Sequence, residues 1–139
     1  MPAQQLVTRY LFILKIPDID TIGFFRSCSG LRLTCDVLEY AEGGNNDFVH
    51  QLPGVLRYPR LKLERGLTNE DALIKWFLNT RTAVDLKEIT LTLQGPGSER
   101  VWTFADAFPV EWSGPELHAD ASDMATETLE IAHSGLKLP

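Results

Sequence analysis

Residues 36–66 read DVLEYAEGGNNDFVHQLPGVLRYPRLKLERG, and this stretch carries the strongest indication of the fold. A segment of alternating apolar and polar residues runs into a Gly-Gly-Asn-Asn loop, and a second alternating segment rich in charge follows the loop. Successive side chains of a strand point to opposite faces, so alternation gives one apolar face and one polar face. The stretch therefore predicts a sheet with one buried face and one solvated face.

The first alternating segment extends back along the chain and predicts a strand over residues 31–40. Its apolar face, which we expect to be buried, holds Leu31, Leu33, Cys35 and Val37. Its polar face holds Arg32, Thr34 and Asp36. The alternation breaks over residues 38–40, where a bulge or the end of the strand is expected.

Residues 41–47 are predicted to form a loop, because glycine and asparagine tolerate positive φ angles. Residues 48–54 extend this loop to a Pro-Gly turn. A strand is expected over residues 55–65, with Pro59 at an edge or a bulge because proline cannot donate a ladder hydrogen bond. In that strand, two apolar residues oppose three charged ones, namely Leu61 and Leu63 against Arg60, Lys62 and Glu64.

Working outward, composition and alternation indicate further strands. They cover residues 9–16, 86–94, 100–104 and 108–112. Residues 17–23 are predicted as a turn, and residues 24–30 as the approach to the strand at residue 31. Residues 123–133 could form a helix by residue type alone, but Thr126, Thr128 and Glu130 alternate with Leu129 and Ile131 and favour a strand.

A single helix is predicted, over residues 68–80. Thr68 or Asn69 can cap it, and the acidic residues that follow suit the positive end of the helix dipole. Its apolar stripe is expected to hold Leu73, Trp76, Phe77 and Leu78, with Ile74 at the margin. The amphipathic pattern predicts that the helix packs on a sheet or a barrel.

The bulk properties indicate one domain, residues 1–139, with its own core. About seven strands and one lateral helix predict a mainly β fold, a small β-barrel or sandwich of antiparallel strands flanked by one α-helix. A net charge of -6 argues against a protein that grips nucleic acid. No apolar run approaches the roughly 20 residues that a bilayer requires, and the first residues lack the features of a signal peptide, so synthesis in the cytoplasm is expected.

No catalytic or metal-binding pattern stands out. His50, His118 and His133 lack neighbours at metal-ligand spacing, and Ser29 lacks the Gly-x-Ser-x-Gly context of a nucleophile. Gly43-Gly44 lacks the lysine and the following helix of a phosphate-binding loop. The two cysteines, Cys28 and Cys35, are interpreted as small, partly buried apolar residues. We therefore predict no enzymatic activity, no metal and no cofactor.

The polar strand faces and unpaired strand edges of the predicted sheet suggest assembly with other copies. Several strands carry a polar face dense in Thr, Glu, Lys and Arg, and a small open sheet leaves strand edges that invite pairing. One solution is a ring in which neighbouring subunits join their sheets edge to edge. The polar face would then line a water-filled channel, as it does in large barrels.

Five segments in collinear order resemble the phage tail tube protein family. They are FFRSCSGL (24–31), VLEYAEGGNNDFVHQLPG (37–54), YPRLKLERGL (58–67), AFPVEWSGP (107–115) and TETLEIAHSGL (126–136). Within that family they are most similar to inner-tube proteins of contractile phage tails and of phage-tail-like contractile injection systems. The chain departs from the family pattern at Ala41, where an arginine is common before Glu-Gly-Gly.

The resemblance implies a β-barrel or sandwich flanked by one helix. It implies hexameric rings that stack into a hollow tube inside a contractile sheath, and partners that include other copies, the sheath protein, baseplate and tube-terminator proteins, and cargo effector or DNA in the lumen. The particle would be a phage tail or a phage-tail-like assembly that can be released from the cell.

The resemblance also implies site residues. A ring-stacking loop would comprise Glu42, Gly43, Gly44, Asn45, Asn46, Asp47, Phe48, Val49, His50 and Pro53. Candidates that face the lumen are Arg32, Thr34, Asp36, Lys62, Glu64, Thr126, Thr128 and Glu130.

Three other functions stay open at this level. The first is a tube-initiator or baseplate subunit of the same fold. The second is a secreted hexameric effector carrier resembling the type VI secretion tube protein. The third is a soluble monomeric binding domain.

Overall fold

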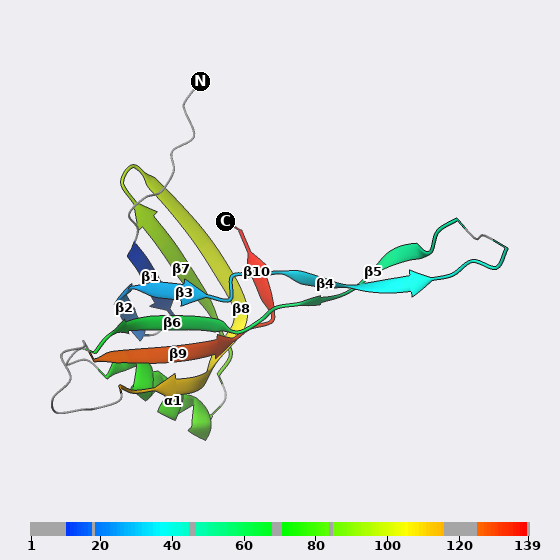
Figure 1. Ribbon diagram of the computed structural model, residues 1–139. Helices are drawn as coiled ribbons and strands as arrows, with labels where there is room; N and C mark the ends of the chain where they lie inside the picture. Colours follow the sequence, from blue (N-terminus) through cyan, green and yellow to red (C-terminus); the bar gives the residue numbers. More distant parts are fainter. Residues whose placement is uncertain are drawn as a thin grey trace.

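The computed structural model describes residues 11–17, 19–44, 47–67, 71–83, 85–115 and 125–138, with only the backbone described for residues 19–24. Within these ranges there are ten strands and one helix (Figure 1). The strands before the helix are β1 (Leu11–Ile16), β2 (Ile19–Phe25), β3 (Ser27–Ser29), β4 (Thr34–Tyr40), β5 (His50–Arg57) and β6 (Leu61–Gly66). They are followed by α1 (Ala72–Thr82), β7 (Lys87–Gly95), β8 (Ser98–Ser113), β9 (Thr126–Ala132) and β10 (Gly135–Lys137).

Eight of the strands form one curved sheet, which we call the body together with α1. The order is β2-β1-β7-β8-β9-β6-β3, with β10 on β8, and all pairs are antiparallel. The sheet bends so that the β1–β7 side and the β6–β9 side face each other across the core (Figure 1). The Arg26 amide donates to the Glu64 carbonyl at 2.9 Å, next to the β3 end of the sheet. The described strands thus form a strongly curved sheet that is not a closed barrel.

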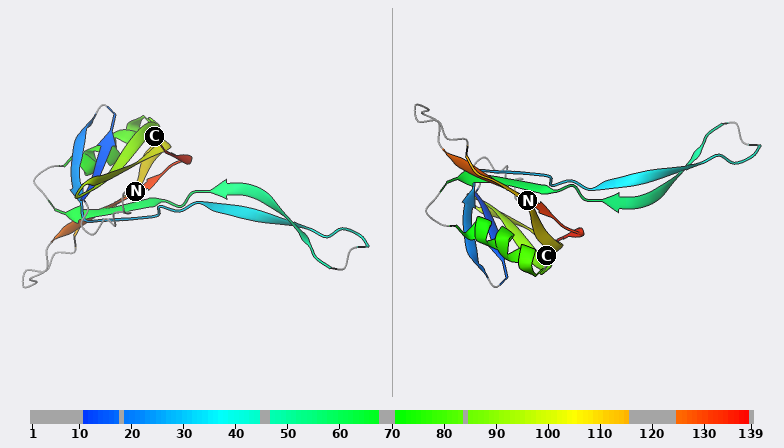
Figure 2. Two further views of the ribbon diagram at one scale, coloured as in Figure 1. Left: turned by 90° about the horizontal axis from the view of Figure 1, so that it is seen from above. Right: turned by 90° about the horizontal axis from the view of Figure 1, so that it is seen from below.

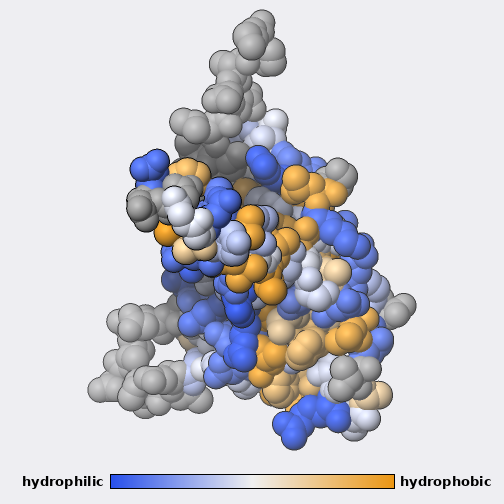
Figure 3. Space-filling view, turned by 90° about the vertical axis from the view of Figure 1, so that its right-hand side faces the viewer, coloured by the Kyte–Doolittle hydropathy of each residue, from blue (hydrophilic) through white to orange (hydrophobic). Residues whose placement is uncertain are grey.

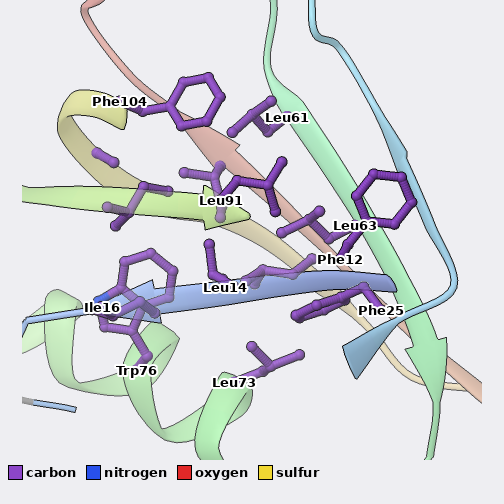
Figure 4. Close-up of a cluster of buried hydrophobic side chains, with 14 residues drawn as sticks. Phe12, Leu14, Ile16, Phe25, Leu61, Leu63, Leu73, Trp76, Leu91 and Phe104 are labelled. Carbon is purple, nitrogen blue, oxygen red and sulfur yellow. The ribbon is translucent and has the colours of Figure 1, made fainter. Parts of the chain in front are cut away.

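The core lies inside this curve and under the helix. Figure 4 shows its apolar side chains, with Trp76 and Leu73 of α1 pointing toward the β1 residues Ile16 and Leu14. The predicted alternation of Leu61 and Leu63 is confirmed, since both are fully buried. The single strand expected over residues 55–65 is wrong, because residues 55–57 end β5 in the two-stranded sheet and residues 61–65 belong to β6 in the eight-stranded sheet. The complete set of buried apolar residues is Phe12, Leu14, Ile16, Phe25, Leu61, Leu63, Leu73, Trp76, Ile89, Leu91, Phe104, Ala107, Leu129 and Ile131.

Strands β4 and β5 form a separate two-stranded sheet that projects from the body (Figures 1 and 2). We call this hairpin the arm, comprising β4, β5 and the described residues between them. The expected burial of its apolar face is wrong for the isolated chain, since Leu33 is 56% exposed and Val37 is 57% exposed. The reason is that, among the described residues, no second layer of this chain lies against the arm.

Several predicted boundaries are also wrong. The expected turn over residues 17–23 is largely β2, because the chain turns at Pro17 and pairs straight back onto β1. The expected loop over residues 48–54 ends at His50, where β5 begins. Pro53 and Gly54 lie inside β5 and form no Pro-Gly turn, because β5 is an edge strand and its register shifts there.

The strands expected over residues 100–104 and 108–112 are one continuous strand, β8. A bend separates them, since Asp106 has a φ of 50°. The strand expected over residues 86–94 is confirmed as β7, and the strand expected within residues 123–133 is confirmed as β9. Strand β10 was not predicted, because three residues are too few to show alternation.

The helix begins and ends later than predicted. Asp71 occupies the N-cap position without a side-chain capping hydrogen bond, and the candidate caps Thr68 and Asn69 lie outside the described residues. Leu73 and Trp76 are buried as predicted, but Leu78 is 54% exposed and does not belong to the packed stripe. In the described part of the chain, no helix is long and apolar enough to cross a membrane. The prediction of a mainly β, antiparallel fold with one flanking helix is confirmed.

Candidate functional site

The tip of the arm holds the residues predicted to stack rings. Asn45 and Asn46 lie outside the described residues, whereas Glu42–Gly44 and Asp47–Val49 flank them on the tip. Gly44 has a φ of 91°, which favours glycine, and a Cβ on Gly43 or Gly44 would meet nothing within 4 Å. The two glycines therefore shape the turn and leave its outer surface open.

A small aromatic cluster stands beside this turn. His50 Nε2 lies 3.1 Å from Glu42 Oε2. The ring of Phe48 meets the His50 ring edge-on at 4.7 Å between centroids, and the Tyr40 ring lies at 6.3 Å. These side chains are exposed or half-buried, so the cluster presents a surface and encloses no pocket.

The base of the arm carries a fixed ion pair. Arg57 Nε donates to both Oδ1 and Oδ2 of Asp36 at 2.9 Å, and Arg57 Nη2 lies 2.8 Å from Oδ2. These hydrogen bonds lower the pKa of Asp36 below its ordinary value and raise the pKa of Arg57. Thr34 pairs with Arg57 across the strands, whereas Arg32 precedes β4 and is exposed.

The outer face of β6 and β9 brings together the other predicted lumen residues. Lys62 pairs with Glu130, Glu64 pairs with Thr128, and Thr126 pairs with Gly66. A shallow polar hollow of about 220 Å³ on this face is lined by Lys62, Glu111, Ser113, Thr128 and Glu130. The predicted set therefore falls into two groups, one on the body and one at the base of the arm.

Two residues of this hollow, Glu111 and Ser113, were missed by sequence reasoning. They pair with Glu130 and Thr128, respectively. Trp112, between them, points to the opposite side of the sheet and packs against the core. The alternation of apolar and polar residues over 109–113 could have placed Glu111 and Ser113 on the polar face.

Exposed ion pairs border the same face. Arg60 Nη1 lies 3.8 Å from Glu130 Oε2, and Arg26 Nε lies 3.6 Å from Glu64 Oε1. Both arginines are more than half exposed, so these pairs contribute little to stability. The face is polar and of mixed sign, which suits contact with water.

Comparison with known proteins identifies the family. The model of the T4-like virus tail tube protein gp19 family matches residues 8–137. The chain belongs to this tail tube protein family. Among proteins with curated functions, none matches the sequence of this tube protein.

Solved structures share the fold over nearly the whole chain. A chain of the anti-feeding prophage baseplate, solved with 6-fold symmetry, has 25% identity and a TM-score of 0.80, covering 100% of the tube protein and 97% of that chain. A chain of the PVC sheath-tube complex, from an extracellular contractile injection system, has 25% identity and a TM-score of 0.80, with coverages of 96% and 91%. A chain of the PVC sheath/tube terminator has a TM-score of 0.83 at 24% identity, covering 99% of each chain, which shows a common fold.

Inside the tube protein's body, a buried ion pair lies on the opposite side of the β6–β9 sheet. Arg65 Nε donates to Glu127 Oε1 at 2.5 Å, and Trp112 Nε1 donates to Glu127 Oε2 at 3.1 Å. The guanidinium of Arg65 also lies 5.6 Å from the centre of the Phe25 ring. Sequence reasoning missed this pair, although Arg65 continues the buried alternation of β6.

Two more titratable groups are shielded by the fold. His133 lies between the rings of Tyr58 and Phe104, with centroids at 5.5 Å and 4.7 Å, and burial lowers its pKa. Cys28 is half-buried against the core, and burial raises the pKa of its thiol to about 11. Cys35, expected to be partly buried, is exposed on the arm. No cluster of three or more potential metal ligands occurs among the described residues.

Proposed function

We propose that this tube protein is a structural subunit that forms hexameric rings, which stack into a hollow tube inside a contractile sheath. The tube would deliver cargo, an effector or DNA, through a target envelope, without catalysis. The observation that carries the proposal is the arm: a hairpin that leaves the body and exposes apolar side chains on both of its faces.

An isolated two-stranded hairpin is at best marginally stable in water. Leu38, Leu52 and Phe48 are each more than half exposed, so the arm requires a partner that covers it. The relatives named above come from a sheath-tube complex and from a baseplate with 6-fold symmetry, which supports assembly with other copies and with sheath, baseplate and terminator proteins. Such a particle would be a phage tail or a phage-tail-like assembly that can be released from the cell.

The polar face of β6 and β9 is the proposed lining of the lumen. Its group comprises Lys62, Glu64, Thr126, Thr128 and Glu130, and we include Glu111 and Ser113 because they line the same hollow. Arg32, Thr34 and Asp36 would continue the lining at the base of the arm. Mixed charge on this surface would discourage tight binding of cargo of either sign.

A second candidate function is a tube-initiator or baseplate subunit. The chain is as similar to a component of the anti-feeding prophage baseplate as to one of a sheath-tube complex, with TM-scores of 0.80 in both cases. An initiator would form a single ring and stop, whereas a tube subunit would polymerise. Polymer length therefore separates the two.

Negative-stain electron microscopy with mass photometry of the purified protein tests the proposal. We expect particles of six subunits and hollow stacks of rings. Single rings that never stack, even at high protein concentration, would support the initiator. Monomers that persist when purified baseplate is added as a template would contradict both functions.

Replacement of Gly43 by valine tests the role of the tip. A Cβ at Gly43 would meet nothing within 4 Å in the monomer, so the fold should be unchanged. We expect rings without tubes, because the added side chain occupies the surface that faces the adjacent ring. Gly44 is kept, since its φ of 91° would make a valine there strained in the monomer as well. Long tubes from the Gly43→Val variant would contradict the stacking role.

A further inference from the structure

The arm joins the body through two short linkers, which we call the root. One linker is residues 30–33, between β3 and β4, and the other is residues 58–60, between β5 and β6. A Cβ on Gly30 would lie 2.0 Å from the Arg60 carbonyl oxygen, so the two linkers are in close backbone contact. Figure 3, which looks along the arm toward the body, shows apolar side chains (orange) at the surface beside charged ones (blue). The root sets the direction in which the arm presents its side chains.

Tyr58 packs the root onto the body. Its ring lies 5.5 Å from the ring of His133, between centroids, and its hydroxyl oxygen would lie 4.0 Å from a Cβ on Gly135. The His133 ring also meets the Phe104 ring edge-on, at 4.7 Å between centroids. Phe104 is fully buried in the core (Figure 4), and β10 lies where the arm leaves the body (Figure 1). His133 therefore links the root to the core through two ring contacts.

The place of His133 follows from the alternation of β9. Leu129 and Ile131 are fully buried, and His133 comes two residues later, just after the strand ends at Ala132. Its Nδ1 atom is buried and makes no hydrogen bond among the described residues. An apolar ring would fill this place without such a nitrogen. A charged histidine carries a proton on both ring nitrogens, so charging His133 places a proton on the buried Nδ1.

Burial, and not a neighbouring charge, controls the charge of His133. Burial lowers its pKa below the ordinary value of 6.5, and backbone groups of Gly135 and Pro59 oppose this with a smaller effect. The titratable and charged side chains nearest to it along the surrounding segments are Tyr58 and Arg60 of the root, Asp106 of β8, Glu130 of β9 and Lys137 of β10. Arg60 lies 3.8 Å from Glu130, and Asp106 accepts a hydrogen bond from Ser134 at 3.0 Å. None of these charged groups is a cause of the lowered pKa of His133.

We propose that His133 is a pH-sensitive lock on the root of the arm. The neutral ring holds Tyr58 against the body. The charged ring leaves its place between Tyr58 and Phe104 for water, and the root loses this contact with the core. The arm then changes its angle to the body more freely, while β4 and β5 stay paired with each other. The lock is a property of the single chain, and its consequence for tube assembly rests on the proposed function.

The direction of the pH effect follows from the burial of His133. The chain with the lock closed binds fewer protons than the chain with the lock open, because an exposed ring has the ordinary pKa of 6.5. The lock is therefore closed above pH 6.5 and opens as the pH falls through the pKa of the buried ring. Between pH 7.5 and pH 5.5, the ratio of open to closed chains should rise several-fold, and by no more than roughly tenfold.

Single-molecule fluorescence energy transfer measures how freely the arm moves relative to the body. One dye is attached to Cys35, which is exposed on the arm, and the Lys75→Cys substitution supplies the second position, exposed on α1. Cys28 is half-buried and its thiol has a pKa of about 11, so it reacts slowly with the dyes. Picomolar concentrations keep the chain monomeric, so contacts with other copies do not contribute.

Two further substitutions in the labelled chain are matched controls. His133→Phe keeps an aromatic ring between Tyr58 and Phe104 but cannot be charged. His50→Gln removes the other described histidine, which lies near the tip of the arm. We expect the distribution of transfer efficiency to broaden from pH 7.5 to pH 5.5 in the labelled chain and in its His50→Gln variant, and to stay narrow in His133→Phe.

Three results would overturn the lock. They are a distribution that does not change with pH in the labelled chain, broadening that persists in His133→Phe, and broadening that disappears in His50→Gln.

Mass photometry and negative-stain electron microscopy of the unlabelled protein test the consequence for assembly. We expect fewer and shorter tubes at pH 5.5 than at pH 7.5, and no such difference in His133→Phe. Equal assembly of the two proteins at pH 5.5 would overturn the link between the lock and assembly. Failure of the unaltered protein to form rings on a baseplate at pH 7.5 would instead overturn the proposed function, while the energy-transfer measurement decides the lock separately.

Discussion

The body and the arm both contain strands of alternating apolar and polar residues, but the apolar residues are buried in the body and exposed on the arm. Strand β6 alternates apolar and polar residues, and its apolar residues Leu61 and Leu63 are fully buried. Strand β4 also alternates, yet Val37 is 57% exposed. The body covers its apolar faces with its own curved sheet and helix, whereas the described part of the chain places no second layer against the arm. Alternation thus indicates that a face will be covered, but does not say by which molecule.

The sharpest test of this comparison concerns the two ion pairs. Glu127→Ala should reduce the free energy of unfolding by about 3–5 kcal/mol, because it leaves Arg65 charged, buried and unpaired. Asp36→Ala on the exposed arm should leave the urea midpoint of the monomer unchanged. Urea unfolding of both variants, at concentrations where the protein is monomeric, checks this. A double variant, Arg65→Met with Glu127→Leu, should recover most of the unfolding free energy that Glu127→Ala loses, because it removes the unpaired charge. If the double variant recovers none of it, the loss comes from packing and not from the unpaired charge.

Leucine truncations compare the apolar groups of the two regions. Leu129 is fully buried in the body, so Leu129→Ala should cost about 2–5 kcal/mol in unfolding free energy. Leu52, on the arm, is 51% exposed, and Leu52→Ala should leave the monomer's urea midpoint unchanged. A large loss from Leu52→Ala in the monomer would show that the arm packs on its own chain, contrary to the structure.

Glycine substitutions compare the root and the tip of the arm. Gly30 has a φ of 92°, and a Cβ there would lie 2.0 Å from the Arg60 carbonyl oxygen. Gly30→Ala should therefore cost about 1–3 kcal/mol, measured by thermal unfolding. Gly43→Ala, with open space around its Cβ, is the control and should leave the monomer unchanged. Equal effects of the two would mean that the chain is no more constrained at the root of the arm than at its tip.

The smallest expected effect concerns pH. Burial lowers the pKa of His133 below its ordinary value of 6.5, so the folded protein binds fewer protons than the unfolded chain. The stability that neutral His133 provides is present above pH 6.5 and is lost as pH falls through its folded pKa. The loss of unfolding free energy between pH 7.5 and pH 5.5 should therefore be larger in the unaltered protein than in His133→Gln. Identical losses would show that His133 does not contribute.

Local sequence patterns predicted much of the body. The strands at β7 and β9 and the helix α1 were confirmed because each carries a period of two or of 3.6 that burial requires. The alternation of β6 was recognised for the same reason, but its strand was joined to the end of β5. Strand β2 was missed because Pro17 and two aspartates resemble a turn, although the segment is held by pairing with β1. The buried pair of Arg65 and Glu127 was missed because charged residues in a core are rare unless they are paired, and the pairing joins residues far apart in the chain.

The candidate site was predicted in its residues but not in its arrangement. The resemblance selected Lys62, Glu64, Thr128 and Glu130, and cross-strand register places them together on one face. Thr34 and Asp36 were assigned to the same group, but they lie apart on the arm. Which of these side chains line a lumen stays a prediction, since it depends on neighbouring copies.

The sequence by itself determined the family, the mainly β class and the positions of most strands and of the helix, because collinear motifs, periodicity and turn residues are local properties of the chain. Only the tertiary structure decided that β4 and β5 leave the body, that β5 carries a bulge at Gly54, and that Arg65 and Glu127 meet inside the core. Each of these depends on which strands pair and in which register, and this is settled by the whole chain at once.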